Sequence, residues 1–413
     1  MNITNIKEML AGTLNLEPPW KIEGAEFDTE HKQLHIHVGI DENAVLLCPH
    51  CGGSAKRYGY EPRERLWRHA DCFFYECFVH CRRPRVICPN CGVQQLNAPF
   101  ERKSSRFTLM FEGYAMMLLP DLPRARAAKV LRCNEKTLEA IMHYWIGRAD
   151  EARSLASVAR LAIDETSFRR GHDYVTIAID ADKKCVIDVE HGKDKAAVAS
   201  IATKLSRQGG NTESIKAVTS DMSKAFVPAI AECFPQACHV IDKFHVKQMV
   251  IKAMEETRKT EQRNCKAKKE LFLGRKLFMI PSSTMTQEQA SQVLKLSKSY
   301  PQTGRAFRIV TALDSFYALW NEDEAGTAFD KLYSWMRRCH LPEMKKVATS
   351  IKEHKPKILA YFTQRITNAI SEGINSLIQT AKRKAKGYRT YRGFEAMIYL
   401  IAGKLELAVP SPF

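Results

Sequence analysis

Two pairs of cysteines constrain the first hundred residues more tightly than any other feature of the chain. They occur in the segments CPHCG at residues 48–52 and CPNCG at residues 88–92. Each segment places two thiolates on one tight turn, and its glycine lets the backbone open toward a metal ion. Two such turns supply four sulfur ligands. The sequence therefore predicts a tetrahedral structural Zn²⁺ site formed by Cys48, Cys51, Cys88 and Cys91.

The exact ligand set stays open, because the 36 residues between the pairs are more than a minimal zinc ribbon contains. That stretch holds further side chains that could replace a ligand, namely Cys72, Cys77, Cys81, His69 and His80. Surface cysteines paired by chance are a second interpretation. A redox role is disfavoured, since no thioredoxin-like succession of strand and helix surrounds either pair.

The same stretch mixes arginines with aromatic residues. Guanidinium groups that contact phosphates and rings that stack on bases would suit it to DNA. A solvated basic face is the alternative interpretation. The residues concerned are Arg57, Arg63, Arg65, Arg68, Arg82, Arg83, Arg85, Tyr58, Tyr60 and Trp67.

Length and charge narrow the class of protein. The 413 residues suffice for two or three domains, and their formal net charge of +17 favours a polyanionic partner such as nucleic acid. The sequence contains no apolar run of membrane-spanning length, no amphipathic anchor and no signal peptide. We therefore expect a cytoplasmic protein, associated with the nucleoid when bound to DNA and without a membrane partner. Its 13 cysteines are expected as thiols or ligands rather than disulfides.

Residues 104–150 have helical patterns. A first helix is expected from a cap at Ser104 or Ser105 to Leu119, where Pro120 ends it. Two short amphipathic helices follow, separated by a break in which Asn134 is a suitable cap. Their expected apolar faces consist of Ala127, Ala128, Val130 and Leu131, and of Leu138, Ile141, Met142 and Trp145.

This arrangement predicts a helix-turn-helix motif. Its second helix would offer Glu135, Lys136 and Glu139 to a major groove. The candidate DNA-binding residues here are Arg124, Arg126 and Lys136. A helical hairpin that binds nothing is the alternative.

The stretch RLAIDETSFRRGHDYVTIAID at residues 160–180 predicts a strand, a turn and a second strand. The first strand is expected to end in Asp164, an acid that needs either a structural partner or a cleft with a cation. Further strands are expected at 185–190, 215–219 and 238–241, and helices at 194–206 and 226–234. Asp221 follows the fourth strand and Asp242 follows the fifth. A mixed sheet of this order can bring the ends of the first and fourth strands together.

A third acid lies much later, in ITNAISEGINSLIQTAKRKAKGYR at residues 366–389. One expected helical face consists of Ile366, Ile370, Gly373, Ile374, Leu377 and Ala381, and a polar stripe opposite consists of Asn368, Glu372, Asn375 and Gln379. Such a helix could present Glu372 to the strand ends. A merely solvated glutamate is the alternative. The DNA-binding candidates Lys382, Arg383, Lys384 and Lys386 follow, where a phosphate backbone could pass.

Four segments together carry a family resemblance. The stretches IDETSFRRGHDYVTIAID, TSDMSKAF and HVIDKFHV, with the segment at 366–389, resemble transposases of bacterial insertion sequences of the ISL-three type. The preceding cysteine pairs and helix-turn-helix match that family's domain order, so the resemblance covers nearly the whole chain. It implies an α/β RNase H-like mixed-sheet catalytic domain, interrupted by a mostly helical insertion.

The resemblance also implies the active site. It assigns the catalytic acids of a DDE transposase to Asp164, Asp221 and Glu372, which would hold two Mg²⁺ ions, with Mn²⁺ as a substitute. Supporting roles fall to Asp242, His245, Asn368 and Asn375. No small-molecule cofactor is expected.

The expected domains follow the same resemblance. They are a zinc-binding DNA-recognition module at 1–100, the helix-turn-helix at 104–150, the catalytic domain at 155–250 and 351–413, and the helical insertion at 251–350. Aromatic residues of the insertion, Phe316, Tyr317 and Trp320, are expected in its core rather than stacked on bases.

The expected function is DNA transposition. The protein would bind terminal inverted repeats of double-stranded DNA, cleave at the ends of the element and join the 3′-hydroxyls to target DNA. Because two ends must be held together, a homodimer or larger homo-oligomer is expected. The alternatives are a catalytically silent DNA-binding regulator derived from a transposase and a structure-specific nuclease on the same fold.

Overall fold

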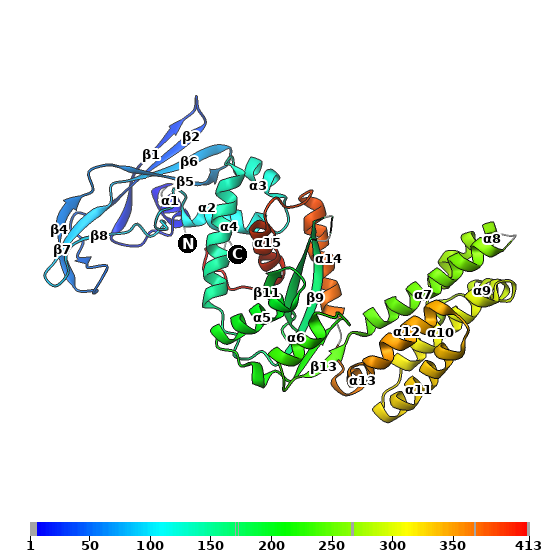
Figure 1. The fold of residues 1–413 in the computed structure, drawn as a ribbon. Coiled ribbons are helices and arrows are strands. Elements are labelled where there is room, and N and C mark those ends of the chain that lie inside the picture. Colours follow the sequence, from blue (N-terminus) through cyan, green and yellow to red (C-terminus); the bar gives the residue numbers. More distant parts are fainter. Residues whose placement is uncertain (1–5, 170, 172, 266–267, 367–368, 411–413) are drawn as a thin grey trace. The chain divides into compact units, whose positions relative to one another are not determined.

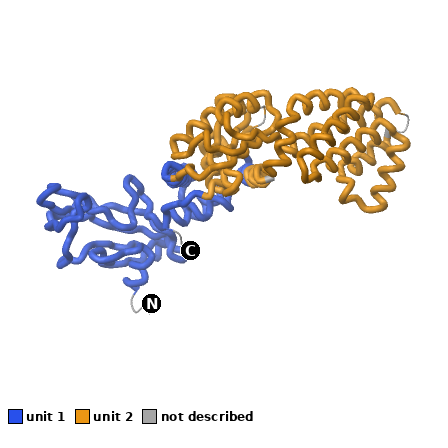
Figure 2. The backbone as a smooth tube through the Cα atoms, turned by 90° about the horizontal axis from the view of Figure 1, so that it is seen from below, with its two compact units in different colours: residues 1–152, 381–387, 405–413 blue, residues 153–380, 388–404 orange. Residues whose placement is uncertain are grey.

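The computed structural model describes residues 6–169, 171, 173–265, 268–366 and 369–410. The chain forms two compact units, coloured separately in Figure 2. The first unit consists of residues 1–152, 381–387 and 405–413, and the second consists of residues 153–380 and 388–404. In the described part of the chain, no helix has the length and apolar character needed to cross a membrane.

Two four-stranded sheets form most of the first unit, after the short helix α1 (Ile6–Thr13). The first sheet has the order β1 (Trp20–Asp28), β2 (Gln33–Ile40), β6 (Tyr75–Cys81) and β5 (Arg65–Cys72). Only its central pair, β2 and β6, is parallel. The second sheet is antiparallel, with the order β3 (Leu46–Leu47), β4 (Ser54–Tyr60), β7 (Pro84–Cys88) and β8 (Gly92–Gln95).

Alternation along β2 and β6 gives the first sheet one buried face. Leu34, Ile36 and Val79 lie inside a core that also contains Trp67. The expectation that Trp67 stacks on DNA bases is therefore wrong, because its ring is fully buried against Phe100. Arg68 is buried as well. These residues stabilise the module instead of forming its outer surface.

The helical part of the first unit contains α2 (Leu109–Leu118), α3 (Arg124–Val130) and α4 (Glu135–Ala152). The expected cap of α2 at Ser104 or Ser105 is wrong, because the side chain of Thr108 accepts the N–H of Phe111. Asn134 does cap α4, where its Oδ1 accepts the N–H of Thr137 at 2.8 Å.

Glu112 of α2 fixes this helical arrangement from inside. Its carboxylate is fully buried and binds the guanidinium of Arg102 at 2.8 Å. It also accepts the indole N–H of Trp145 from α4 at 2.7 Å. The expected apolar face of α4 is buried, whereas Val130 at the end of α3 is exposed, contrary to expectation.

A five-stranded mixed sheet forms the centre of the second unit. Its order is β11 (Cys185–His191), β10 (Asp173–Asp180), β9 (Arg160–Arg169), β12 (Ala217–Ser220) and β13 (Cys238–Ile241). The first three strands are antiparallel, and β9, β12 and β13 run parallel to one another. The apolar side chains of Leu161 and Ile163 contact residues of α5 (Lys195–Arg207) and α6 (Phe226–Cys233) in one core.

One further short 3-10 helix, η1 (Thr212–Ser214), precedes β12. The remaining helices of the second unit follow β13. After β13 come α7 (Lys243–Asn264), α8 (Lys268–Leu273), η2 (Gly274–Met279), η3 (Ser282–Thr284), α9 (Gln287–Ser299), α10 (Pro301–Tyr317), α11 (Glu322–Arg338), α12 (Pro342–Glu353) and α13 (Lys355–Gln364). The chain then forms α14 (Ala369–Lys384) and α15 (Tyr391–Ala402), and Figure 1 labels most of these helices.

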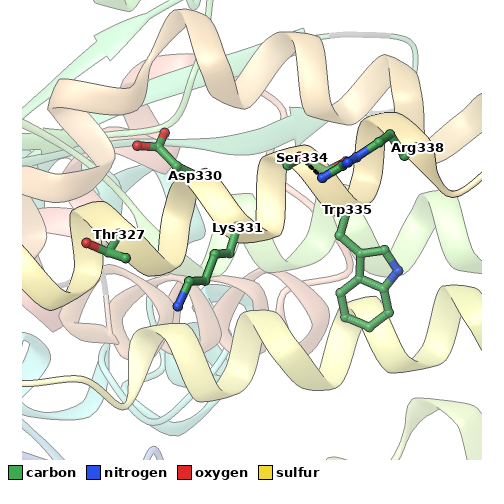
Figure 3. Close-up of a pocket in the computed structure, with 6 residues that line it drawn as sticks. All are labelled: Thr327, Asp330, Lys331, Ser334, Trp335 and Arg338. Atoms are coloured by element: carbon green, nitrogen blue, oxygen red, sulfur yellow. Dashed lines mark hydrogen bonds between the residues drawn. The ribbon is translucent and has the colours of Figure 1, made fainter.

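The helices between α7 and α13 share one apolar core. Phe316 and Tyr317 lie in it as expected, but Trp320 is 85% exposed. The guanidinium of Arg365 lies 4.9 Å from the ring centroid of Trp320 and covers one face of it. A depression on the outer side of α11, shown in Figure 3, is lined by Asp330, Trp335 and four other residues of that helix.

Candidate active site and metal centre

Three acids follow or lie beside the ends of three parallel strands. Strand β12 pairs with β9 from Arg160 to Ala162 and stops at Ser220. Extending that register by two residues brings Asp221 beside Asp164. On the other side, Ser220 pairs with Ile241, and the N–H of Asp242 donates to the carbonyl of Ser220 at 2.9 Å. The parallel register thus places the three acids in one row across β9, β12 and β13, at the level where β12 and β13 end.

Asp164 itself lies in the middle of a strand, not at its tip. The sequence indicated an end at this residue, but β9 continues to Arg169 because its second half still pairs with β10. On the other side of β9, the pairing with β12 ends at Ala162. Asp164 is 7% exposed, and its Oδ1 accepts the N–H of Glu165 at 2.8 Å.

Helix α14 lies beside the sheet in Figure 1, and its contacts are with the face of β9 that carries Asp164. The amide Nδ2 of Asn375 donates to Oδ2 of Asp164 at 2.9 Å. One turn later, Nε2 of Gln379 donates to Oγ1 of Thr166 at 2.9 Å. Asp164 and Thr166 share one side of the strand, so the polar stripe of the helix follows the polar side of β9. Glu372 lies three residues before Asn375, on the same stripe.

The orientation of α14 differs from the sequence expectation in two ways. Leu377 is 54% exposed, whereas Ile378 is buried. The hydrogen bonds of Asn375 and Gln379 to β9 turn Leu377 toward solvent, because a residue two positions away lies nearly opposite on a helix. Asn368, a proposed supporting residue, lies outside the described residues.

Two acids of this region, Asp164 and Glu372, have raised pKa values. Burial raises the pKa of Asp164 to about 6, and the negative charges of Asp242 and Asp221 add to this effect, while nearby His245 opposes it. Burial also raises the pKa of Glu372, followed by the charge of Asp242. Asp242 thus acts on both Asp164 and Glu372, and Asp221 acts on Asp164.

His245 is a cationic partner of these acids. Its Nδ1 lies 3.0 Å from Oδ2 of Asp242, which also caps the first turn of α7. Burial lowers the pKa of His245, but the hydrogen bond to Asp242 and the charge of Asp164 outweigh this and raise it overall. Asp242 is almost fully buried. The pair therefore anchors the start of α7 at the edge of the acid cluster.

The donor set fits a hard divalent cation. Carboxylate and amide oxygens are the ligands that Mg²⁺ prefers. Oδ1 of Asn375 is buried and has no hydrogen-bond partner among the described residues. A buried amide oxygen without a partner is costly, so a cation or its bound water at this position would satisfy it. Asp164, Asp221 and Glu372 are the acids that could share such a cation.

Sequence reasoning missed two residues at this site. Lys243 follows Asp242, donates to the hydroxyl of Tyr361 at 3.3 Å, and lowers the pKa of Glu372 by its charge. Thr166, two residues after Asp164, receives the hydrogen bond of Gln379. The period of two along β9 was the available signal for Thr166.

The four cysteines of the two pairs come together in the second sheet of the first unit. Cys48, Cys51, Cys88 and Cys91 have sulfur atoms within 4.8 Å of one another. Gly52 and Gly92 adopt φ values of 71° and 69°, which explains the glycine after each pair.

Two thiols of this group, Cys48 and Cys91, have strongly perturbed pKa values. The backbone N–H of Cys51 and those near it lower the pKa of Cys48 to about 6. Contact with Cys51 and the other thiols raises the pKa of Cys91 to about 12. Crowded thiols of this kind lose their protons to a bound metal, so the donor chemistry supports a structural Zn²⁺.

The alternative ligands lie elsewhere. Cys77 and Cys81 are buried in the core around Trp67, where burial raises the pKa of each to about 12. His69 is buried and its Nδ1 lies 2.8 Å from the hydroxyl of Thr108. Among the described residues, Cys72 and His80 also fall outside the four-cysteine group.

The DNA-binding candidates differ in their surroundings. Arg124 is held by acids of α4, with Glu139 at 3.1 Å and Glu135 at 3.5 Å. Arg126 and Lys136 are exposed. At the end of α14, Arg383, Lys384 and Lys386 are exposed and Lys382 is partly buried.

Comparisons with known proteins agree in three successive regions. Residues 45–91 match the zinc-finger of transposases IS204/IS1001/IS1096/IS1165, residues 97–146 match the helix-turn-helix domain of transposase family ISL3, and residues 161–398 match the ISL3 DDE family described as transposase. The first two matches support zinc and DNA binding.

Individual relatives are also insertion-sequence transposases. The chain is 25% identical over 386 residues to the transposase for insertion sequence element IS1557 of Mycobacterium tuberculosis, covering 87% of this chain and 86% of that protein. It is 24% identical over 367 residues to the transposase for IS1001 of Bordetella parapertussis, covering 85% and 87%. The transposase family match covers more than half of the chain, which therefore belongs to the ISL3 family of insertion-sequence transposases.

Proposed function

We propose that this protein is a Mg²⁺-dependent DDE transposase whose catalytic acids are Asp164, Asp221 and Glu372. One observation carries the proposal. The helix that bears Glu372 is hydrogen-bonded through Asn375 to Asp164, whose pKa also responds to the charge of Asp221. This contact between residues more than 200 positions apart supports one shared group of oxygen ligands, as a metal-dependent phosphoryl transfer requires.

The three acids would hold two Mg²⁺ ions, and Mn²⁺ can replace them. When bound, the metal activates the attacking water or 3′-hydroxyl and neutralises charge on the leaving oxygen. Asp164 contributes a carboxylate that is fixed by Asn375 and by the N–H of Glu165. Glu372 enters from the helix, and Asp242 with His245 holds the start of α7 beside it. No side chain acts as the nucleophile.

The fold proposal has its own support. The strand order β11-β10-β9-β12-β13, with two antiparallel and two parallel pairings, suits an RNase H-like catalytic domain. We propose catalytic segments at 155–250 and 351–413, and a helical insertion at 251–350, between them. Helices from α8 to α12 account for most of that insertion. The zinc-binding DNA-recognition module would span 1–100 and the helix-turn-helix 104–150.

The N-terminal modules would recognise terminal inverted repeats in double-stranded DNA. Arg126 and Lys136 are exposed for phosphate contacts, and Arg383, Lys384 and Lys386 would bind the strand that leaves the active site. Joining two ends of an element requires two active sites, so a homodimer or larger homo-oligomer is expected.

A cleavage assay tests this function. Purified protein is incubated with Mg²⁺ or Mn²⁺ and labelled DNA that carries the inverted repeat flanking its gene. Asp164→Asn and Glu372→Gln should each abolish metal-dependent nicking at the repeat end while DNA binding persists. Asp182→Asn is the matched control, because it removes an exposed acid beyond the start of β9 that pairs with Arg160.

Three results would change the assignment. Binding without cleavage by the unmodified protein would favour a regulator. Cleavage without joining to target DNA would favour a nuclease on the same fold. Full activity of Asp164→Asn would exclude the proposed acids.

A further inference from the structure

A second group of possible metal ligands lies on the outer face of the first sheet. His37 of β2, His80 of β6 and Glu64, just before β5, have ligand atoms within 4.8 Å of one another. His37 and His80 are direct neighbours in the parallel register of β2 and β6. Their rings stack with centroids 4.7 Å apart. This group belongs neither to the four-cysteine group nor to the acid cluster.

A hydrogen-bond chain sets the orientation of His80. Nε2 of His35 lies 3.2 Å from Oε1 of Gln33, an atom that can only accept, so His35 carries its proton on Nε2. Its Nδ1 is therefore an acceptor, and it lies 2.9 Å from Nε2 of His80. His80 must donate from Nε2. The Nδ1 lone pair of a neutral His80 is then directed elsewhere.

That lone pair faces a carboxylate. Nδ1 of His80 lies 3.0 Å from Oε2 of Glu64. Two acceptors at this distance repel each other unless a cation lies between or beside them. His37 offers a further imidazole at the same place. The side chains of His80 and Glu64 are 19% and 48% exposed, so the position is open to ions from solution.

We propose that His37, Glu64 and His80 form a second metal site, distinct from the four-cysteine site and independent of the proposed catalytic function. Two imidazoles and one carboxylate with a solvent-accessible fourth position suit Zn²⁺ and similar divalent transition metals, not Mg²⁺. His35 is a positioning residue, since its hydrogen bond fixes the tautomer of the ligand His80.

The site would fasten a turn to the sheet. Glu64 lies in the connection of residues 61–64 between β4 and β5, whereas both histidines lie on the two central strands. Glu61 in the same connection already binds Arg83 and Arg65. A metal at Glu64 would therefore hold this connection, which includes Arg63, in one conformation.

Metal titration of the full-length protein tests the proposal. Metal-free protein that carries Asp164→Asn, Asp221→Asn and Glu372→Gln, so that the acid cluster takes up no ion, is titrated at pH 8 with Co²⁺ and then Zn²⁺. Thiolate ligands give Co²⁺ an intense charge-transfer band, and a site of imidazole and carboxylate does not. We expect about two equivalents to bind, with only one producing the thiolate band. Binding of a single equivalent would mean that a proton bridges His80 and Glu64, and the proposal would be wrong.

Variants separate the ligands from the positioning residue. His37→Gln and His80→Gln should each lose the second equivalent and keep the thiolate band, which also reports that the module is folded. His31→Gln changes an exposed histidine in the turn between β1 and β2 that contacts Asp28, and it should keep both equivalents. His35→Phe should keep both but bind the second about 10- to 100-fold more weakly. Retention of both equivalents by His80→Gln, or unchanged affinity in His35→Phe, would contradict these roles.

Discussion

The four-cysteine group and the acid cluster are assembled over very different lengths of sequence. Each half of the cysteine group is one tight turn, with both sulfurs within four residues of each other. The acid cluster takes one residue from each of several elements, and β-sheet register decides which atoms meet. Metal ligands that a local turn brings together can be identified from their spacing in the sequence. Ligands that strand pairing brings together can be identified only once the tertiary structure is known.

The two groups also differ in how they affect the stability of the fold around them. The thiols lie in the small second sheet, which has a limited apolar core, so a metal would contribute directly to its stability. The acids lie beside a sheet that packs on a large apolar core, and burial together with neighbouring negative charge makes the ionised Asp164 unfavourable in the folded state. We therefore expect the first site to be needed for folding and the second to be needed for chemistry.

Loss of a cysteine should have the largest effect. Cys88→Ser should remove Zn²⁺ and unfold the sheet β3-β4-β7-β8, because a structural zinc contributes on the order of 10 kcal/mol to such modules. The five-stranded sheet should stay folded. Zinc analysis with hydrogen exchange checks this. Cys72→Ser is the control, since Cys72 lies outside the four-cysteine group. If the sheet of Cys88→Ser stayed folded without zinc, the four-cysteine site would not be needed for folding.

Loss of the central acid should have the opposite effect on stability. The folded pKa of Asp164, about 6, lies above its ordinary value of 3.8, so the ionised carboxylate is disfavoured by folding at higher pH. Asp164→Asn should therefore raise the free energy of unfolding by about 1–3 kcal/mol at pH 8 without added Mg²⁺. The gain should shrink as pH falls and vanish below about pH 4, where Asp164 is protonated in both states.

Urea denaturation at several pH values measures this difference. Asp182→Asn should show no comparable gain, because that carboxylate is exposed. A destabilised Asp164→Asn at pH 8 would mean that the carboxylate is needed for folding as well.

Removal of the hydrogen bond from α14 should have an intermediate effect. Asn375→Ala frees the carboxylate of Asp164, and we expect metal-dependent cleavage to fall about 10- to 100-fold, as for other residues that orient metal ligands. The Mn²⁺ concentration for half-maximal cleavage should rise. Gln379→Ala is matched to it, since it removes a hydrogen bond one turn later that reaches Thr166 and no acid. Equal losses in both variants would indicate a general packing effect.

The smallest effect should come from the helix-turn-helix. From the sequence, Arg124 and Lys136 were equally good candidates for DNA contacts. Lys136→Ala should weaken DNA binding about equally for all sequences and reduce the salt slope by about 1, because Lys136 is exposed for a phosphate contact. Arg124→Ala should leave that slope unchanged, since its guanidinium is paired with Glu139. Binding titrations at several salt concentrations distinguish the two, and equal slopes in both variants would be the contrary result.

Much of the framework could be predicted from patterns in the chain. Alternation and apolar runs placed the strands of the five-stranded sheet, and Asn134 was correctly predicted as a helix cap. The fully buried Trp67 and the exposed Trp320 were not predictable, because aromatic side chains suit cores and surfaces alike.

The candidate sites divide in the same way. The cysteine group followed from spacing, and the three acids followed from the family resemblance. The contact of Asn375 with Asp164 depends on how α14 is rotated, and apolar residues around the helix left that rotation open. The group of His37, Glu64 and His80 depends on parallel pairing of β2 and β6 across more than 40 residues, which no local pattern indicates.

The register of β9 also suggests one way in which mutation would inactivate copies of such an element. Side chains alternate across a strand, so deleting one residue between Arg160 and Ile163 would turn Asp164 to the opposite face of the sheet. All three acids would still be present in the gene, in their familiar local motifs. A gene copy with this deletion would still encode all three catalytic acids. Its element would nevertheless be unable to move.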